Sequence, residues 1–159
     1  MESNPLAEYR TRLLGQLLKS TEAFCAACRA ARDPKKSANN DQWNIHQLAQ
    51  HVRDVNAQSY VPRIRRTLAE DYPAFVKFDA DAWAAGHYNA DEPLEKILGE
   101  LEENVGDVVA ELKAQPDSAW SRLGHHDIHG DRTLQIWVER SLEHIREHLE
   151  TVKAGVKEG

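Results

Sequence analysis

The sequence has no run of uncharged apolar residues long enough to cross a membrane, and it has no excess of basic residues. A membrane-spanning helix needs about 20 consecutive apolar residues, so we expect no membrane partner. The 159 residues include 20 Lys and Arg against 26 Asp and Glu, a formal net charge of −6. Because proteins that bind nucleic acid present a basic face to the phosphates, this balance argues against a nucleic-acid partner.

The first residues of the sequence also do not have the pattern of a secretory leader. The first nine residues, M-E-S-N-P-L-A-E-Y, lack the basic start and the apolar run of a signal peptide. The composition, with 41% apolar and 29% charged residues, is ordinary for a globular protein. We therefore expect a cytoplasmic protein.

Cysteine is scarce, with Cys25 and Cys28 alone in the chain. Their C-x-x-C spacing occurs in redox pairs and in half of a four-thiolate zinc site. No second C-x-x-C completes such a site, and no strand pattern precedes this one, as a thioredoxin-like motif requires. The flanking F-C-A-A-C-R-A-A is typical of a helix interior, so we interpret both cysteines as small buried residues of a helix.

Strand-like alternation is absent from the pattern, whereas helical periodicity covers most of the chain. Apolar residues recur at steps of three and four, as on one face of a helix. The four segments concerned are 6–32, 44–69, 91–115 and 133–155. They predict an all-α protein, a four-helix bundle formed as a single domain over residues 1–159.

Local signals mark the ends of these helices and the connections between them. Asn44 with Gln47 forms a capping-box pattern, and Asp91 and Thr133 are predicted caps of the third and fourth helices. Pro62 should kink the second helix or split off its last two turns. Two connections, 72–89 and 118–132, are longer than a simple bundle needs, and we expect a short helical turn near 79–85 in the first.

Two histidines lie one helical turn apart in the last segment. His144 and His148 are neighbours on one face, beside the apolar stripe of that helix. Two imidazoles so placed can hold one divalent ion. The third ligand should come from the inner side of another helix, where His51, between Leu48 and Val55, is the only candidate.

A metal held by three neutral imidazoles keeps an open position for water or substrate, the pattern of a catalytic rather than a structural zinc site. Water bound there can ionise near pH 7, and a bound thiol becomes a thiolate. A ligating histidine usually donates its second ring N–H to a carboxylate or carbonyl. Asp54, nearly one turn after His51, is the nearest carboxylate by helical spacing.

Other interpretations of these residues stay open. Histidines at i and i+4 occur by chance on helix surfaces. The stretch H-I-R-E-H also matches the inverted zinc-protease motif H-x-x-E-H, in which Glu147 would be the general base. Outside that motif, Glu147 is expected either to orient a neighbouring ligand, as Asp54 would, or to face solvent. The cluster of His125, His126 and His129 lies in a predicted connection and is expected at the rim of the site. The basic run Arg63–Arg66 is expected to extend along a helix surface, or to bind an acidic group of a substrate.

Four short motifs then point to a family. They are W-N-I-H-Q-L-A-Q-H-V-R-D at 43–54, F-D-A-D-A-W at 78–83, H-x-x-x-G-x-x-T-L at 126–134 and H-I-R-E-H-L at 144–149. With these motifs in this order, the sequence resembles the DinB-like, YfiT-like superfamily of metal-dependent hydrolases and thiol transferases. The resemblance implies a four-helix bundle and a nickel or zinc ion on three histidines, which by motif position are His51, His144 and His148.

Two positions depart from the family pattern. Many relatives have a histidine where this chain has Gln50, and a second histidine beside the last ligand, where this chain has Leu149. Neither change removes a metal ligand, but both would make the substrate pocket differ from that of the relatives. The family label gives no reason to expect DNA binding.

The first functional hypothesis is a metal-dependent enzyme that transfers a low-molecular-weight thiol to an electrophile, both of them small molecules. The alternatives are metal-dependent hydrolysis by bound hydroxide and a non-catalytic metal-binding stress protein. Relatives are often dimeric, and Val109 and Ile136 lie off the main apolar stripes, so we also expect a homodimer.

Overall fold

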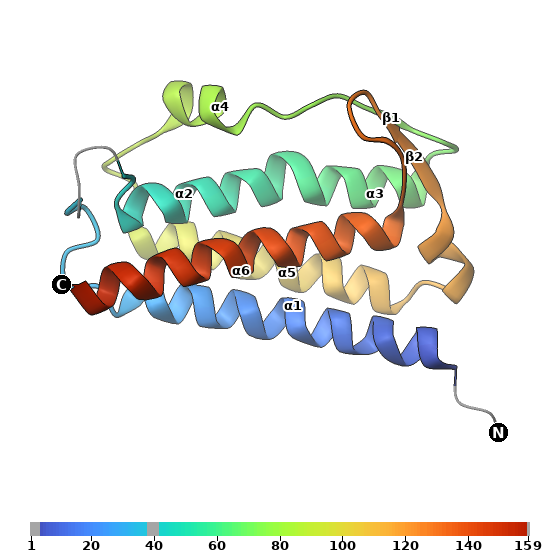
Figure 1. The fold of residues 1–159 in the computed structure, drawn as a ribbon, viewed down its shortest axis with the longest axis horizontal. Coiled ribbons are helices and arrows are strands. Elements are labelled where there is room, and N and C mark those ends of the chain that lie inside the picture. Colours follow the sequence, from blue (N-terminus) through green and yellow to red (C-terminus); the bar gives the residue numbers. More distant parts are fainter. Residues whose placement is uncertain (1–3, 38–41, 159) are drawn as a thin grey trace.

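The computed structural model describes residues 4–37 and 42–158, which form a bundle of four long helical rods (Figure 1). The second rod is built from three consecutive helical pieces. The elements of the rods are α1 (Pro5–Arg29), α2 (Ile45–Val55) with η1 (Asn56–Tyr60) and α3 (Val61–Ala69), α5 (Leu94–Lys113) and α6 (Leu134–Glu158). α1 packs against α5 and α6, and α2 packs against the same two helices. The predicted four-helix bundle is confirmed.

At two of the three predicted caps, a side chain accepts a hydrogen bond from a backbone amide in the first turn of the helix. Asn44 Oδ1 accepts from the Gln47 amide, and Gln47 Oε1 accepts from the Asn44 amide, both at 2.8 Å. Thr133 Oγ1 accepts from the amide of Ile136 at 3.3 Å. The predicted cap at Asp91 is wrong: Pro93, with an extended ψ of 132°, is the cap position, and α5 begins at Leu94 without a side-chain cap.

The second rod changes from an α-helix to a π-helix just before Pro62. Asn56–Tyr60 form a π-helix, and Pro62 lies in the first turn of α3. Proline has no N–H to donate and its ring crowds the preceding turn. The rare π-helix occurs mostly as a single turn inside an α-helix, as it does here. The interruption predicted at Pro62 is thus a short π-helical segment, after which the rod continues as an α-helix to Ala69.

A small three-stranded sheet corrects the all-α prediction. β1 (Ala74–Phe75) pairs in parallel with β2 (Leu123–His126), and β2 pairs antiparallel with β3 (Gly130–Thr133). These strands, two to four residues long, are too short for alternation to show in a sequence. The chain is predominantly helical, and the sheet joins its two long connections.

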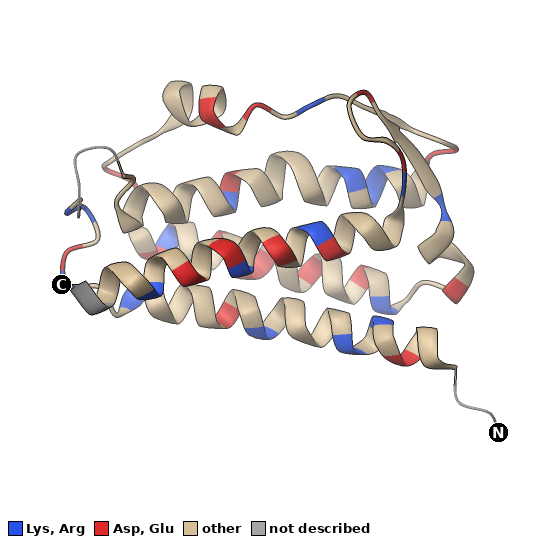
Figure 2. Ribbon diagram, viewed as in Figure 1, with Lys and Arg blue, Asp and Glu red and all other residues tan. Residues whose placement is uncertain are grey.

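The interior is made of the inward stripes of the four rods. Leu17, Phe24, Val52, Leu101 and Ile145 are each at most 1% exposed. Charged residues of both signs are interspersed along the outer helix surfaces (Figure 2). Across residues 4–37 and 42–158, no helix is both long and apolar enough to span a bilayer.

One further helix, α4 (Ala80–His87), lies outside the bundle above α2 (Figure 1). Asp79 caps it by accepting from the amide of Ala82 at 3.0 Å. The helical turn expected near 79–85 is therefore confirmed. α4 covers the part of α2 that carries His51.

Candidate metal centre

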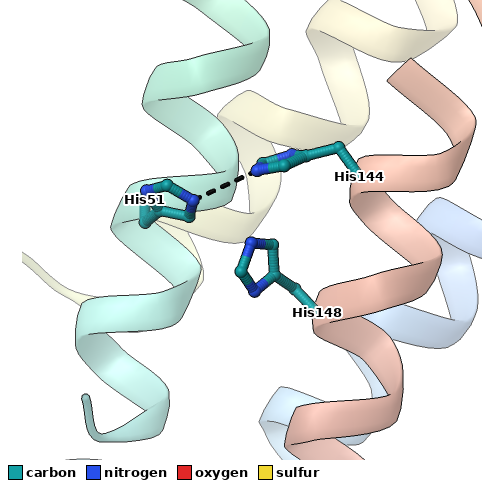
Figure 3. A group of neighbouring side chains, drawn as sticks. All are labelled: His51, His144 and His148. Atoms are coloured by element: carbon teal, nitrogen blue, oxygen red, sulfur yellow. Dashed lines mark hydrogen bonds between the residues drawn. The ribbon is translucent and has the colours of Figure 1, made fainter. Parts of the chain in front are cut away.

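The bundle brings His51, His144 and His148 to one point (Figure 3). One ring nitrogen of each lies within 4.8 Å of those of the other two. The Nε2 atoms of His51 and His144 are 3.1 Å apart. His51 comes from α2, and the other two come from successive turns of α6, so the site joins two helices that pack against each other.

Burial keeps the three rings uncharged. It lowers the pKa of His51 to about 4, with a smaller contribution from the charge on His148. Burial also lowers the pKa of His144 to about 3, again assisted by the neighbouring rings, and it lowers the pKa of His148. At neutral pH each ring therefore has a free nitrogen lone pair, the form that binds a metal.

The donor set fits a divalent transition metal. Ligands about 2.0–2.1 Å from a tetrahedral zinc lie about 3.3 Å from one another, close to the 3.1 Å between the two Nε2 atoms. Two lone pairs so close repel each other unless a proton or a cation lies between them. Three imidazoles without a protein carboxylate or thiolate suit several divalent metals, among them zinc, copper, iron and nickel, and leave a coordination position open.

A cavity of about 440 Å³ adjoins the site between α2 and α4. His51 lines it together with the aromatic side chains of Trp43, Phe78, Trp83 and Tyr88. The Trp43 ring lies 4.9 Å from that of His51. A cavity of this size with apolar walls and a few polar groups is typical of small-molecule sites.

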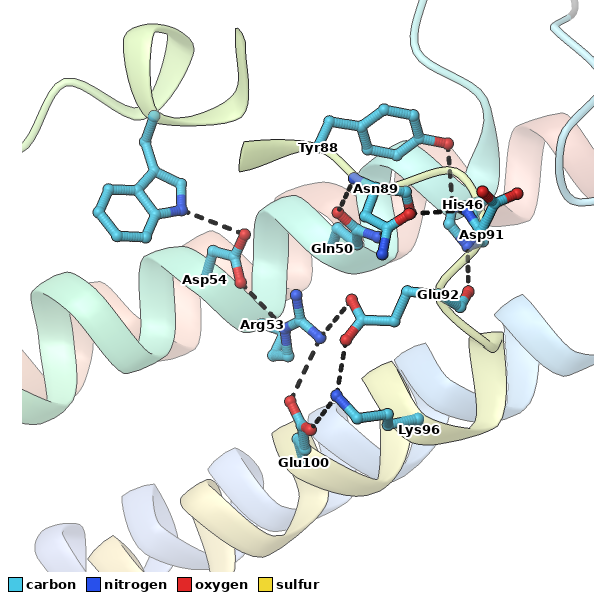
Figure 4. A network of polar contacts seen from close by, with 11 residues as sticks. His46, Gln50, Arg53, Asp54, Tyr88, Asn89, Asp91, Glu92, Lys96 and Glu100 are labelled. Carbon is cyan, nitrogen blue, oxygen red and sulfur yellow. Dashed lines mark hydrogen bonds and ion pairs between the residues drawn. The ribbon is translucent and has the colours of Figure 1, made fainter. Parts of the chain in front are cut away.

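Asp54 fastens α4 over this cavity (Figure 4). Its carboxylate accepts from Trp83 Nε1 at 3.2 Å and from Arg53 Nε at 2.9 Å. The predicted contact with His51 is not what the structure has: among the hydrogen bonds of residues 4–37 and 42–158, none joins Asp54 to His51. The carboxylate points toward α4, so Asp54 positions the cavity wall.

A polar network ties the connection after α4 to the same face of α2 (Figure 4). Arg53 also donates to Glu92 at 2.7 Å and to Glu100 at 3.2 Å. Gln50 donates to the Asn89 carbonyl and accepts from the Asn89 amide. The network holds the connection that carries Tyr88, so Gln50 shapes the cavity without binding in the three-histidine cluster.

His46 is a fourth histidine of this face, and it is 1% exposed. Its Nδ1 accepts from the Tyr88 hydroxyl at 2.8 Å, and its Nε2 donates to the Glu92 carbonyl at 2.7 Å. Both ring nitrogens are thus used to hold the wall of the cavity. Neither the sequence pattern nor helical spacing had singled out His46, because its partners come from a loop more than 40 residues away.

Glu147 is exposed on α6. Its charge raises the pKa of its neighbour His148, against the lowering by burial. The predicted rim cluster is split: His125 and His129 are exposed, whereas His126 is 1% exposed. The predicted connection has become a hairpin, and this buries His126.

Comparison with known proteins agrees with this geometry. A sequence model described as the DinB superfamily matches residues 5–152. Among solved structures, the chain is similar to YfiT from Bacillus subtilis, with a TM-score of 0.76 at 22% identity, covering 99% of this chain and 91% of that one. YfiT is described as a probable metal-dependent hydrolase with an unusual four-helix bundle topology. Among curated proteins, none matches.

Proposed function

The chain belongs to the DinB superfamily, and from that premise we propose that it is a metal-dependent enzyme acting on small molecules. His51, His144 and His148 are the proposed ligands of one divalent ion, nickel or zinc. The observation that carries the proposal is their convergence beside a cavity of about 440 Å³. When bound, the ion would lower the pKa of a thiol or a water molecule at its open position.

Of the two reactions that this chemistry allows, we favour the transfer of a low-molecular-weight thiol to an electrophile. Hydrolysis gains from a carboxylate that takes a proton from the attacking water. Asp54 is engaged by Arg53 and Trp83, and Glu147 is exposed. A thiol needs no such base once its pKa is lowered, and the aromatic walls suit the apolar body of an electrophile.

The chain's own residues have separate tasks in this proposal. The three rings fix the position of the ion, and their burial keeps them neutral at pH 7. Trp43, Phe78 and Trp83 line the cavity and give it aromatic walls. Asp54 and Gln50 hold its outer wall through Trp83 and Asn89.

Hydrolysis is the second candidate, and it is favoured by the description of YfiT as a probable metal-dependent hydrolase. At 22% identity the likeness shows a shared fold, so its reaction is a hypothesis for this chain. Asp81, which also lines the cavity, is the remaining carboxylate that could accept a proton there. A third candidate, a metal-binding stress protein without catalysis, would leave the cavity unused.

One assay separates the three candidates. Nickel- or zinc-loaded protein is incubated with an electrophilic dye and a panel of low-molecular-weight thiols, and in parallel with an activated ester without thiol. The proposal predicts a rate that depends on both metal and thiol, lost in His148→Ala and kept in the matched surface variant His125→Ala. Ester cleavage without thiol would favour hydrolysis, and no activity with full metal occupancy would favour the stress protein.

A further inference from the structure

His126, at the end of β2, is buried and has a defined tautomer. Its Nδ1 accepts from the backbone amides of Ile128 at 3.1 Å and His129 at 3.2 Å. Burial lowers the pKa of the ring, as does the charge on Arg63, which keeps it neutral at pH 7. A neutral imidazole has one N–H, and since Nδ1 accepts, the hydrogen lies on Nε2.

That Nε2–H faces a second donor. Arg63 Nη2 lies 3.3 Å from His126 Nε2, and a guanidinium has no acceptor. Asp127 Oδ1 lies 3.3 Å from Nδ1, on the other side of the ring, and already accepts from the Lys77 amide at 3.0 Å. Two N–H groups are therefore directed toward each other with no acceptor between them, which is costly in a buried setting.

Arg63 also differs from the other arginines of α3. Arg65 pairs with Glu111 at 2.7 Å, and Arg66 with Glu70 at 2.6 Å. Among the ion pairs of residues 4–37 and 42–158, none includes Arg63. Its guanidinium instead lies 4.8 Å from the ring centroid of Trp137, half-buried. The charge of Asp127 partly offsets the desolvation of Arg63 without pairing with it. A desolvated cation that has no ion pair favours the binding of an anion.

We propose that Arg63 and His126 form a binding site for an oxyanion, the carboxylate or phosphate group of a small molecule. One oxygen of the anion would accept from both donors and so remove their conflict. A guanidinium binds either group through its planar set of N–H donors. The basic run Arg63–Arg66 thus has one member, Arg63, directed at a ligand and two members, Arg65 and Arg66, that pair with acids of the chain.

This anion site is a neighbour of the three-histidine cluster. Tyr60, one helical turn before Arg63, has its ring centroid 5.8 Å from that of His144. Along α6, Trp137 and His144 are two turns apart, about 10 Å at 1.5 Å per residue. The anion site itself rests on no metal chemistry.

The test reads the ring nitrogens of His126 by long-range ¹H–¹⁵N NMR on the full chain after treatment with a chelator. Acetate and, separately, inorganic phosphate are titrated at constant ionic strength, with chloride as the balancing ion. We expect the Nε2–H tautomer and a saturable shift of the Nε2 resonance with at least one of the two. Saturation by acetate assigns the site to carboxylates, and saturation by phosphate assigns it to phosphates.

Two variants locate the anion. In Arg63→Gln the affinity should fall at least tenfold, and in Arg65→Gln, whose partner is Glu111, it should stay at the wild-type value. An Nδ1–H tautomer in the wild type, the absence of a saturable shift with either anion, or equal affinities of Arg63→Gln and wild type would overturn the proposal. Because the wild-type tautomer and titration decide the first two points, the test holds even if Arg63→Gln does not fold. Because the titration is done without metal, failure of the anion-site proposal can be distinguished from failure of the proposed enzyme activity.

Discussion

Cys25 and Cys28 are fully buried on α1 and form no disulfide. Burial raises the pKa of the Cys28 thiol to about 12, and burial together with the nearby Glu102 carboxylate raises the pKa of Cys25 further. The thiolate is the form that reacts and that binds metals. The interpretation of this C-x-x-C as part of a helix core is therefore confirmed.

The expected consequence is that neither cysteine reacts in the folded protein. At pH 8 a disulfide reagent such as Ellman's should release no colour from native protein and should titrate both thiols after guanidinium is added. Rapid labelling of either thiol without denaturant would contradict the burial of this part of α1.

The histidines show how far spacing alone predicts a site. His51, His144 and His148 each lie at helical spacing beside an apolar stripe, so the inward faces of two packed helices were enough to predict their meeting. His46, Asp54 and His126 depend on loops and on the hairpin. Their partners are distant in the sequence, and no local periodicity carries that information.

At the level of elements, the cavity depends most on α4 and on the hydrogen bond from Trp83 to Asp54 that holds this helix over α2. The predicted role of Asp54 beside a metal ligand becomes a role in holding Trp83. Removing the indole N–H while keeping an aromatic ring should loosen α4 without touching the three histidines.

Trp83→Phe should accordingly leave metal affinity within about twofold of wild type. If the enzyme activity proposed above is present, KM for the electrophile should rise more than kcat falls, because the wall binds the substrate and does not react with it. Asp54→Asn should behave in the same way. A loss of metal affinity in either variant would instead return Asp54 to the role predicted from spacing.

The small sheet offers a second test at this scale. Gly124 on β2 lies so close to Phe75 on β1 that an added Cβ would be 2.5 Å from the Phe75 ring. Phe75 is itself packed against Trp137, so it has little room to move. Overpacking of this kind costs about 1–3 kcal/mol.

Gly124→Ala should therefore lower the free energy of unfolding by about that amount, measured by urea denaturation. Gly106→Ala on α5, where a Cβ would meet nothing within 4 Å, is the matched control and should be neutral or stabilising. Equal stability of the two variants would mean that β1 and β2 are not held together as described.

The elements differ in how well the sequence predicts them, for physical reasons. Long amphipathic helices repeat their signal over many turns, so their number and approximate ends could be predicted. The strands have at most four residues and form because two connections meet, which no local pattern shows. The start of α5 was misplaced because Pro93 set the backbone where an acidic cap at Asp91 was expected.

For the whole molecule, the homodimer stays a prediction, although one argument for it changes. Val109 is 2% exposed and belongs to the core, so it is not available to a partner, and Ile136 is only partly exposed. Light scattering at micromolar concentration should show twice the mass of the 159-residue chain. A single-chain mass across that range would exclude the dimer.

The central claim is that the two helices α2 and α6 hold a metal ion between them, and its free energy of binding should appear as stability of the whole bundle. An ion that binds the folded chain and hardly the unfolded one raises the melting temperature. The hydrophobic core is made of apolar side chains from all four rods, so the protein should fold without the ion.

The most direct measurement is the melting temperature of untagged protein with and without chelator, beside elemental analysis and the variant His148→Ala. The account predicts one zinc or nickel ion per chain, and a lower melting temperature after chelation. His148→Ala should be folded, poor in metal, and should melt with the chelated wild type whether or not chelator is added. A wild-type protein that holds no metal and melts at the same temperature with and without chelator would contradict the account.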